Sequence, residues 1–431
     1  MMNSFEDLGV PQNLLNKLSA QGIDEPTPIQ YKTIPNALDG KDILGLAQTG
    51  TGKTAAFALP LLAQVLRIGG KREEKSVQSL ILAPTRELAK QIDTTIKAFV
   101  EGSHLRVRLV VGGVSIVGQV KRLSKGSDIL VATPGRLIDL LNRNAVRLDD
   151  TKFLVLDEAD QMLDLGFIHS LRKIADLLPE NRQTMLFSAT MPKKMGELAS
   201  SYLRDPIRVE AAPSGKVADK ITQSIHFVLK QDKNKLLTDL LARHKDELAI
   251  VFSRTKHGAE KLLKTIINSG CSAVSIHGNK SQAQRERALD AFRSGKNKVL
   301  VATDVAARGL DIPLVKHVYN FDLPNVAENY VHRIGRTARA GSDGCAIAFC
   351  SSEEISELRA IQKVLGASIP VASGKPWVDF DAEMHTRKNP KSRTRGGWNR
   401  KKFSGSRKKK NSFASPQKGH RGRSGKAALV A

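Results

Sequence analysis

Two acidic residues close a strongly apolar segment near the middle of the chain. Asp157 and Glu158 follow Phe153–Leu156, a short apolar run that predicts a buried strand. Carboxylates at the mouth of a buried strand are costly to desolvate unless a cation meets them. A magnesium–nucleotide complex would supply that positive charge. An isolated acidic pair would favour a simpler interpretation, namely solvated acids at a strand end beside a helix cap.

A glycine-rich segment upstream ends in a lysine and a threonine. Residues 47–54, with the sequence AQTGTGKT, lie between a predicted strand over 42–46 and a predicted helix over 55–66. Glycines let backbone N–H groups turn inward around phosphate oxygens, and the helix amino terminus adds a favourable dipole. The general phosphate-loop pattern begins with glycine, whereas this one begins with Ala47. The expected nucleotide-binding residues of this loop are Thr49, Gly50, Thr51, Gly52, Lys53 and Thr54.

The two segments together predict a site for a magnesium nucleotide. Lys53 is placed to reach the β- and γ-phosphates, and the Thr54 hydroxyl to ligate Mg²⁺. Asp157 would hold the metal through water, and Glu158 would orient or deprotonate the attacking water. The alternative for the loop is a glycine-rich turn with a solvated lysine. The strand before it, the helix after it and the acids downstream favour the nucleotide site.

Apolar runs alternate with amphipathic segments over most of the chain, which predicts an α/β fold of βαβ units. The alternation stalls in a polar stretch around residues 205–219 and then restarts. We therefore expect an N-terminal domain over 1–208, a linker over 209–219, a second α/β domain over 220–370 and a tail over 371–431. The predicted strands are 42–46, 79–84, 107–111, 128–132, 153–157, 184–188, 226–229, 249–253, 273–277, 298–303, 315–320 and 346–350.

The charge is concentrated at the carboxyl end. The chain of 431 residues has a net charge of +25, and residues 385–431 hold 16 Lys and Arg without an acid. The remaining residues contain 52 Lys and Arg against 43 Asp and Glu, a net charge of +9. A basic body with a strongly basic tail indicates a polyanionic partner, most simply nucleic acid. The tail composition predicts disorder, and a solubilising tail is the alternative to an RNA tether.

Other features of the composition narrow the class of protein. No apolar run is long enough to span a bilayer, and the amino terminus lacks a signal-peptide pattern, so we expect no membrane association. The three cysteines fit neither a disulfide framework nor a zinc pattern. We expect them to be small core residues of a reduced, cytoplasmic protein.

With these motifs in place, the chain resembles the DEAD-box RNA helicases of superfamily 2, from about Phe5 to Phe349. The resemblance implies two tandem RecA-like domains and ATP as the nucleotide. Residues 22–30, with the sequence GIDEPTPIQ, are similar to the family's adenine-recognition motif. A glutamine amide presents a donor and an acceptor together, which suits adenine. By this resemblance the adenine contacts are Phe5, Ile23, Thr27 and Gln30.

Further motifs resemble the RNA-facing segments of that family, and each follows a predicted strand. Hydroxyls, arginines and free backbone N–H groups suit contacts to phosphate and sugar, which read no sequence. Considered as isolated turns, these motifs would be structurally unremarkable. The implied RNA contacts are Pro84, Thr85, Arg86, Gly113, Thr133, Gly135 and Arg136 in the first domain and Arg254, Thr255, Gly278, Arg285, Thr303 and Asp304 in the second.

The second domain is also similar to the family's nucleotide-sensing half. Residues 332–339, with the sequence HRIGRTAR, imply that Arg336 and Arg339 reach the γ-phosphate across a cleft and stabilise charge that develops in phosphoryl transfer. Gly309 and Asp311 match positions that approach the nucleotide. Coupling between ATP turnover and strand separation is implied for Asp160, Ser188, Thr190 and His332.

The resemblance therefore implies an ATP-dependent RNA helicase that separates short duplexes locally and with little sequence preference. Its body and tail look most like bacterial RhlE-like members acting in ribosome assembly or RNA decay, with ribosomal precursor particles or RNA-decay enzymes as partners. A non-enzymatic RNA chaperone would not need the set formed by Lys53, Asp157 and Glu158. A translocating DNA helicase is disfavoured by Gln30 and by the acidic segment that ends at Asp160.

Overall fold

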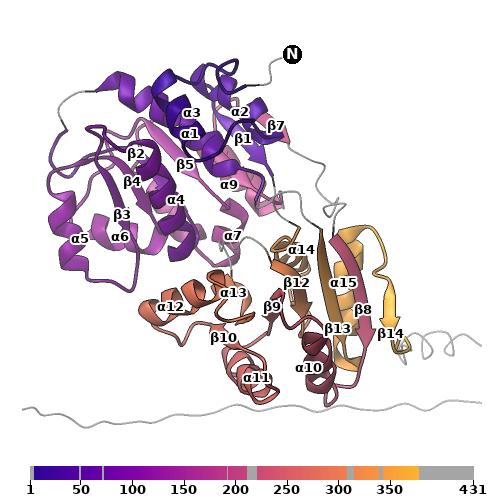
Figure 1. Ribbon diagram of the computed structural model, residues 1–431. Coiled ribbons are helices and arrows are strands. Elements are labelled where there is room, and N and C mark those ends of the chain that lie inside the picture. Colours follow the sequence, from indigo (N-terminus) through magenta and orange to yellow (C-terminus); the bar gives the residue numbers. More distant parts are fainter. Residues whose placement is uncertain are drawn as a thin grey trace, which may run out of the picture. The chain divides into compact units, whose positions relative to one another are not determined.

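Two parallel seven-stranded sheets form the framework of the structure (Figure 1). The computed structural model describes residues 4–47, 50–69, 72–191, 193–210, 221–307, 315–338 and 343–377. Every pair of neighbouring strands in the two sheets runs parallel. These sheets confirm the predicted α/β fold with two similar lobes. No helix within those ranges is both long and apolar enough to cross a bilayer.

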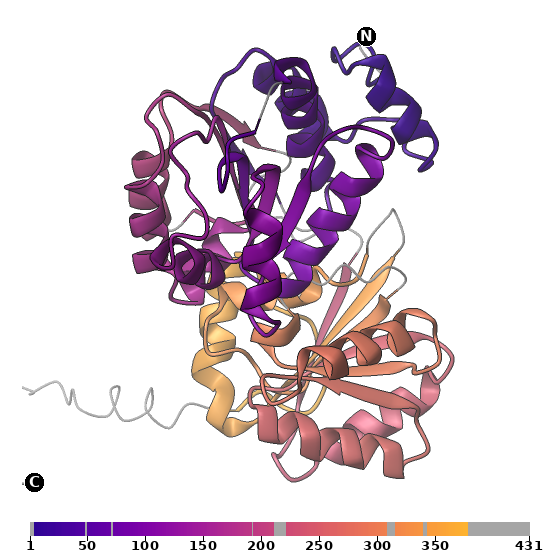
Figure 2. The same ribbon diagram turned by 90° about the vertical axis from the view of Figure 1, so that its left-hand side faces the viewer.

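The first sheet has the strand order β3-β4-β2-β5-β6-β1-β7. Its central strand β5 is apolar at every position, and all residues of β4 and β5 are buried, because helices cover both faces (Figure 2). Helices α1–α4 pack on one face and α5–α9 on the other. The strands are β1 (Ile43–Leu46), β2 (Val77–Leu82), β3 (Val107–Val110), β4 (Ser127–Ala132), β5 (Phe153–Leu156), β6 (Gln183–Ser188) and β7 (Ile207–Glu210). The helices are α1 (Gln12–Ser19), α2 (Pro28–Leu38), α3 (Lys53–Ile68), α4 (Arg86–Phe99), α5 (Ile116–Leu123), α6 (Pro134–Asn142), α7 (Ala159–Asp164), α8 (Ile168–Ala175) and α9 (Lys193–Tyr202).

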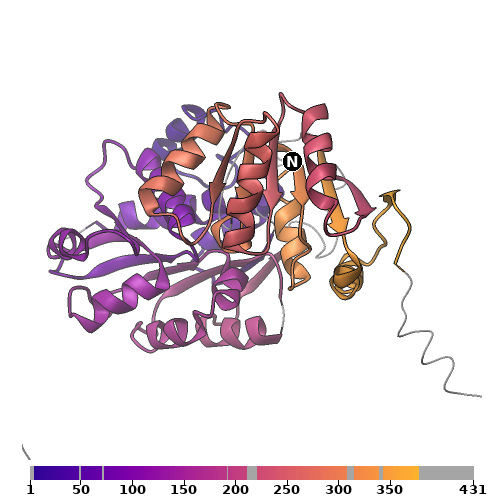
Figure 3. The same cartoon turned by 90° about the horizontal axis from the view of Figure 1, so that it is seen from below.

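The second sheet has the order β10-β11-β9-β12-β13-β8-β14. Helices α10 and α11 pack on one face, and α12–α15 pack on the other (Figure 3). The strands are β8 (Ile221–Phe227), β9 (Leu248–Phe252), β10 (Ala273–Ile276), β11 (Val299–Ala302), β12 (Val315–Asn320), β13 (Gly344–Cys350) and β14 (Val371–Ser373). The helices are α10 (Lys233–Arg243), α11 (Lys256–Asn268), α12 (Gln282–Arg293), α13 (Asp304–Ala307), α14 (Glu328–Ile334) and α15 (Ile355–Leu365), with a short 3₁₀ helix over Ser352–Glu354.

Three details of the secondary structure differ from the sequence-based expectation. Strand β7 extends two residues into the predicted linker, and β14 adds a strand beyond the predicted end of the second domain. Both strands lie at sheet edges, where few apolar residues are needed, so their signal in the sequence is weak. Strand β8 begins at Ile221, well before the predicted residue 226, because its half-buried alternation lacks a continuous apolar run.

The linker and the tail are largely outside the described structure, whereas all three cysteines are within it. Residues 211–220 and the tail from Val378 onward lie outside the described ranges. Cys350 is buried, as expected of a small core residue. Cys271 and Cys345 are partly buried, and Cys271 packs against the core of the second lobe. None of the three is part of a disulfide.

Candidate active site

The phosphate loop turns sharply into α3 at a glycine that no other residue could easily replace. Gly52 has a φ of 88°, in the left-handed region that L side chains rarely adopt. A Cβ atom at this position would lie 2.5 Å from Gln30 Nε2 and 3.1 Å from Thr27 Oγ1. Helix α3 begins at the next residue, Lys53. The turn therefore points the first backbone N–H groups of the helix into the loop, as anion binding requires.

Lys53 is a buried cation without a hydrogen-bonded counterion. Its side chain is 5% exposed, and Nζ lies 3.9 Å from Asp157 Oδ1, beyond hydrogen-bonding distance. Nζ has no hydrogen-bond partner among the described residues. A buried ammonium group in this state is costly unless a ligand completes its contacts. Its position at the amino end of α3 fits the phosphates of a nucleotide.

Asp157 and Glu158 form a desolvated acidic pair at the end of β5. Burial raises the pKa of Asp157 to about 6, the charge of Glu158 acts in the same direction, and Lys53 opposes them. Glu158 has φ 52° and ψ 50°, a left-handed conformation that is strained for a residue with a Cβ atom. Its Oε2 is buried and has no hydrogen-bond partner within the described part of the chain. The pair therefore resembles a prepared cation and water site rather than solvated acids.

Asp160 joins the acidic segment to the end of β6. Its Oδ2 accepts hydrogen bonds from the Ala189 N–H at 3.1 Å, the Thr190 N–H at 2.9 Å and Thr190 Oγ1 at 3.0 Å. His332 Nε2 lies 3.7 Å from the same oxygen, so its contribution is electrostatic. Burial alone would raise the pKa of Asp160, but the imidazole of His332, the charge of Lys53 and the Thr190 hydroxyl hold it at about 2. Asp160 is therefore a stable carboxylate anchor.

The other hydroxyl of this motif has a different partner. Ser188 Oγ donates to the Thr190 carbonyl at 2.7 Å rather than to an acid. The two hydroxyls therefore differ: that of Thr190 donates to the Asp160 carboxylate, whereas that of Ser188 donates to a backbone carbonyl. Residue 188 lies at the end of a buried strand, where its own loop supplies the nearest acceptor.

Gln30 is held in place by the phosphate loop. Its Oε1 accepts from the Thr27 N–H at 2.9 Å, and its Nε2 donates to the Gly52 carbonyl at 3.0 Å. One N–H and one oxygen lone pair of the amide remain, which is the donor and acceptor pair that adenine requires. Thr27 Oγ1 donates to the Thr51 carbonyl at 2.9 Å. Phe5 is buried in the core of the first lobe, and Ile23 packs against the same cluster.

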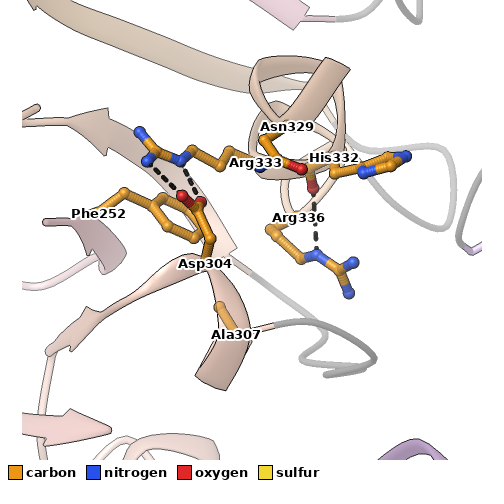
Figure 4. A pocket seen from close by; sticks show the side chains of 7 residues that line it. All are labelled: Phe252, Asp304, Ala307, Asn329, His332, Arg333 and Arg336. Atoms are coloured by element: carbon orange, nitrogen blue, oxygen red, sulfur yellow. Dashed lines mark hydrogen bonds and ion pairs between the residues drawn. The ribbon is translucent and has the colours of Figure 1, made fainter. Parts of the chain in front are cut away.

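Two arginines in the arginine-rich segment of the second lobe have different surroundings. Arg333 is buried and forms a two-point ion pair with Asp304, at 2.5 and 2.8 Å, whereas Arg336 extends away from this pair (Figure 4). Arg336 Nε donates to the His332 carbonyl at 3.2 Å. The carboxylate of Asp304, which is predicted from the sequence to contact RNA, thus forms an ion pair with Arg333. No role was predicted from the sequence for Arg333, which lies in the last turn of α14, whereas Arg336 follows the end of that helix.

The candidate RNA contacts of the first lobe gather on three adjacent strands. They follow β3, β4 and β2, whose carboxyl ends meet at one edge of the sheet. The Arg86 guanidinium lies against the backbone of Gly112 and Gly113, so close that a Cβ at position 113 would be 1.9 Å from Arg86 Nη1. Arg136 Nη1 donates to the Val114 carbonyl at 3.1 Å. The candidate RNA residues therefore lie along one half of this sheet edge. The nucleotide residues follow β5, β6 and β1 and lie along the other half.

Comparison with known proteins gives the family. The DEAD/DEAH box helicase model matches residues 27–198, and the helicase conserved C-terminal domain model matches residues 232–341. The DEAD-box ATP-dependent RNA helicase CshA of Bacillus cereus is 45% identical over 364 residues, covering 84% of this chain and 68% of that protein. The chain belongs to the DEAD-box RNA helicases. It is therefore an RNA-dependent ATPase with helicase activity.

Solved structures confirm the two RecA-like domains of this helicase. The S. cerevisiae protein Dbp5, bound to RNA and ADP BeF3, has a TM-score of 0.77 and 32% identity over 89% of this chain and 99% of that one. The helicase Mss116, bound to ssRNA and UDP-BeF, has a TM-score of 0.78 and 28% identity over 88% of this chain and 82% of that one.

In the second lobe of the helicase, the candidate RNA contacts again follow three adjacent strands, β10, β11 and β9. Two of the arginines have protein partners. Arg254 Nη2 donates to the Leu323 carbonyl and to Glu354 Oε1, both at 3.2 Å. Arg285 Nη2 lies 3.1 Å from Glu87 Oε1. The sequence did not identify either acid, since charge pairs between distant segments leave no local pattern.

The other predicted residues of this group have simpler surroundings or fall outside the description. Thr303 is buried, Gly278 is exposed, and Thr255 accepts from the Gly258 N–H as the cap of α11. The residues outside the described ranges are Thr49, Gly309, Asp311 and Arg339. Their roles stay predictions.

Proposed function

We propose that this helicase hydrolyses ATP at a centre divided between its two lobes and uses closure of that centre on RNA to separate short duplexes locally. One observation carries the proposal. Lys53 Nζ and Glu158 Oε2 are both buried beside Asp157, and neither has a hydrogen-bond partner within the described chain. Each such group costs about 1–3 kcal/mol until a ligand satisfies it. A bound nucleotide and its attacking water would satisfy both.

The roles of the residues follow from their chemistry. Asp157 and Thr54 are oxygen donors of the kind that Mg²⁺ prefers, and the bound ion would neutralise phosphate charge. Lys53 binds the terminal phosphates, and Glu158 accepts the proton of the attacking water. Gln30 recognises the adenine edge with its remaining donor and acceptor.

The second lobe supplies charge that the first lobe lacks. Arg336 and Arg339 stabilise the negative charge that develops on the transferred phosphoryl group. Because the lobes hold complementary parts of the centre, ATP and RNA each favour the closed form. Each ligand then strengthens binding of the other by the same factor.

RNA binding is expected to be largely independent of sequence. The candidate contacts in both lobes are hydroxyls, arginines and backbone N–H groups at strand ends, which suit phosphates and sugars. The basic tail adds a non-specific tether, and each neutralised phosphate should add about 0.7 to the log–log salt slope on single strands. We place the helicase in the cytoplasm, in ribosome assembly or RNA decay, with an RhlE-like role.

Substitution of the proposed base tests the catalytic assignment. Glu158→Gln keeps the size of the side chain but removes its basicity, so RNA-stimulated ATP hydrolysis should fall by about 10²–10⁴-fold while ATP binding persists. Asp164→Asn, an exposed change at the end of α7, the helix that Glu158 precedes, is the matched control. Undiminished hydrolysis by Glu158→Gln would remove Glu158 from the mechanism.

Two further measurements test the preference for RNA over DNA and the proposed cellular pathway. ATPase stimulation by RNA should exceed stimulation by DNA of the same length; equal stimulation would favour a DNA helicase. Crosslinking in cells, with sequencing of the bound RNA, should recover ribosomal precursor or messenger RNA. Recovery of neither would overturn the proposed pathway and leave the ATPase assignment intact.

A further inference from the structure

A histidine–glutamate cluster lies at the amino edge of the second sheet. His244 Nδ1 is 3.5 Å from Glu247 Oε2, and His317 Nε2 contacts the same oxygen more closely. The three ligand atoms all lie within 4.8 Å of one another. Glu247 directly precedes β9, and His317 is near the start of β12. The cluster is therefore at the opposite edge from the strand ends that contain Arg254 and the other candidate RNA residues.

The local fold brings these three side chains together from separate segments. His244 is the carboxyl cap of α10, whose buried leucines pack on the same face of the sheet as Tyr319. Strand β12 has an irregular register against β9 between Val315 and His317. Such a bulge shifts the side chains that follow it to the other face. Val315 accordingly packs on one face, whereas His317 stacks against Tyr319 and His244 on the other.

We infer that His244, Glu247 and His317 form a binding site for a single Zn²⁺-like divalent metal ion. Two imidazoles and one carboxylate are a ligand set that zinc uses, with water in the fourth position. Zinc–ligand bonds of about 2.0–2.1 Å in a tetrahedral site place ligand atoms about 3.3 Å apart. The ligand atoms of the observed cluster, all within 4.8 Å of one another, are already near that spacing. His244 and Glu247 are 36% and 44% exposed, so water has access to the fourth position.

A simple hydrogen-bonded pair accounts for only part of this arrangement. Glu247 and His317 alone would satisfy each other, yet the His244 ring stacks on His317 with 4.2 Å between centroids and directs its Nδ1 to the same carboxylate oxygen. The side chains of both histidines therefore face one carboxylate oxygen, and a metal ion bound between the three groups would use all of them as ligands.

The test uses the full-length, untagged chain without nucleotide. Zn²⁺ is titrated by calorimetry against a competing chelator, and Co²⁺ is substituted so that its visible absorption reports the ligand geometry. We expect one ion per chain, with affinity at least 10-fold weaker in His244→Ala and in Glu247→Gln. His169→Ala, an exposed histidine on α8, is the matched control and should bind as the wild type does. Both cluster variants alter partly exposed side chains, and unchanged RNA-stimulated ATPase activity verifies that they fold.

Thermal unfolding gives a second readout. Zn²⁺ should raise the Tm of the wild type and of His169→Ala but not of the two cluster variants. Equal affinity in all four proteins would place the metal elsewhere, for example on tail histidines, and would overturn the inference. Absence of binding at 100-fold excess Zn²⁺ would also overturn it and leave a stacked, hydrogen-bonded pair.

Discussion

Replacing Asp160 by asparagine should loosen the segment that follows β6 and destabilise the first lobe. The carboxylate is 4% exposed and accepts three hydrogen bonds at Oδ2, from the Ala189 N–H, the Thr190 N–H and Thr190 Oγ1. Its Oδ1 accepts a fourth, from the Gln161 N–H at 3.0 Å. An asparagine oxygen can replace only one of the two carboxylate oxygens, so its NH₂ group must face a donor on the other side.

The pKa shift of Asp160 sets the scale of the expected cost. The pKa of Asp160 is about 2, compared with 3.8 for the ordinary group, and this shift corresponds to about 2.5 kcal/mol of preference for the charged form. A hydrogen bond to a charged group stabilises the folded protein by about 1 kcal/mol more than a hydrogen bond to a neutral group. The lower desolvation cost of an amide offsets part of the stabilisation lost in the variant. For a lobe of this size, a loss of about 2.5 kcal/mol lowers Tm by about 5–10 °C.

The pH dependence of this effect has a definite sign. The pKa of Asp160 is lower in the folded protein than in the unfolded chain, so its contribution to stability is fully present above pH 3.8 and is lost as the pH falls towards 2. Asp160→Asn has no group that titrates there. The stability difference between wild type and variant should therefore shrink over that interval.

Calorimetry and hydrogen exchange of the full chain measure the prediction. Thr190→Val keeps both backbone hydrogen bonds and should cost only about 1 kcal/mol. Asp150→Asn, an exposed change elsewhere in the first lobe, is the control and should stay within about 0.5 kcal/mol of the wild type. In Asp160→Asn the amides of Ala189 and Thr190 should exchange faster, while β5 stays protected. Unchanged exchange at these two amides would refute the claim that Asp160 anchors this segment. A Tm of Asp160→Asn within about 2 °C of the wild type would refute it as well.

Three further changes test other parts of the structure. Gly52→Ala should weaken binding of a fluorescent ATP analogue at least 10-fold, because its Cβ would lie 2.5 Å from Gln30 Nε2 at a φ of 88°, whereas Gly118→Ala, which has open space, should not. Glu158→Gly should raise Tm by relieving about 1 kcal/mol of left-handed strain while abolishing RNA-stimulated ATP hydrolysis; a lower Tm would contradict the strain argument. Burial would raise the pKa of Glu354, but its ion pair with Lys233 holds the pKa below the ordinary value of 4.5. The stability of the second lobe should therefore fall as the pH drops below 4.5, measured as the urea midpoint at each pH. Glu354→Gln should make this pH dependence flatter.

The sequence predicted the central strands and the order of the motifs because both depend on local patterns. Phe153–Leu156 is apolar at every position, and buried parallel strands require this composition. The phosphate loop depends on glycines at fixed positions, which a single sequence displays directly. By contrast, β7 and β14 are edge strands whose pairing is decided by the neighbouring strand rather than by their own composition.

The partners of buried charges could not be predicted in the same way. Glu354 forms a capping box with Ser351, which the local sequence indicates. Its ion pair with Lys233 at 2.5 Å joins residues more than one hundred positions apart, and no local pattern records it. The αL conformation of Glu158 is likewise invisible in the sequence, because it opposes the ordinary backbone preference of glutamate.

The strand order explains how RNA and ATP sites could influence each other within the first lobe. Strand β5, which ends directly before the proposed metal ligand Asp157, pairs with β2, which ends just before the candidate RNA motif at Pro84. The Asp157 N–H donates to the Leu82 carbonyl at 3.0 Å, so a shift of the RNA motif has a direct covalent and hydrogen-bonded route to the acidic pair. On the other side of β5, the Ala47 N–H donates to the Ser188 carbonyl at 3.0 Å. This hydrogen bond joins the phosphate loop to the segment anchored by Asp160. Coupling between two ligands is typically about 1–3 kcal/mol, and these hydrogen bonds between adjacent strand ends are a physical route by which the proposed coupling of ATP and RNA would act.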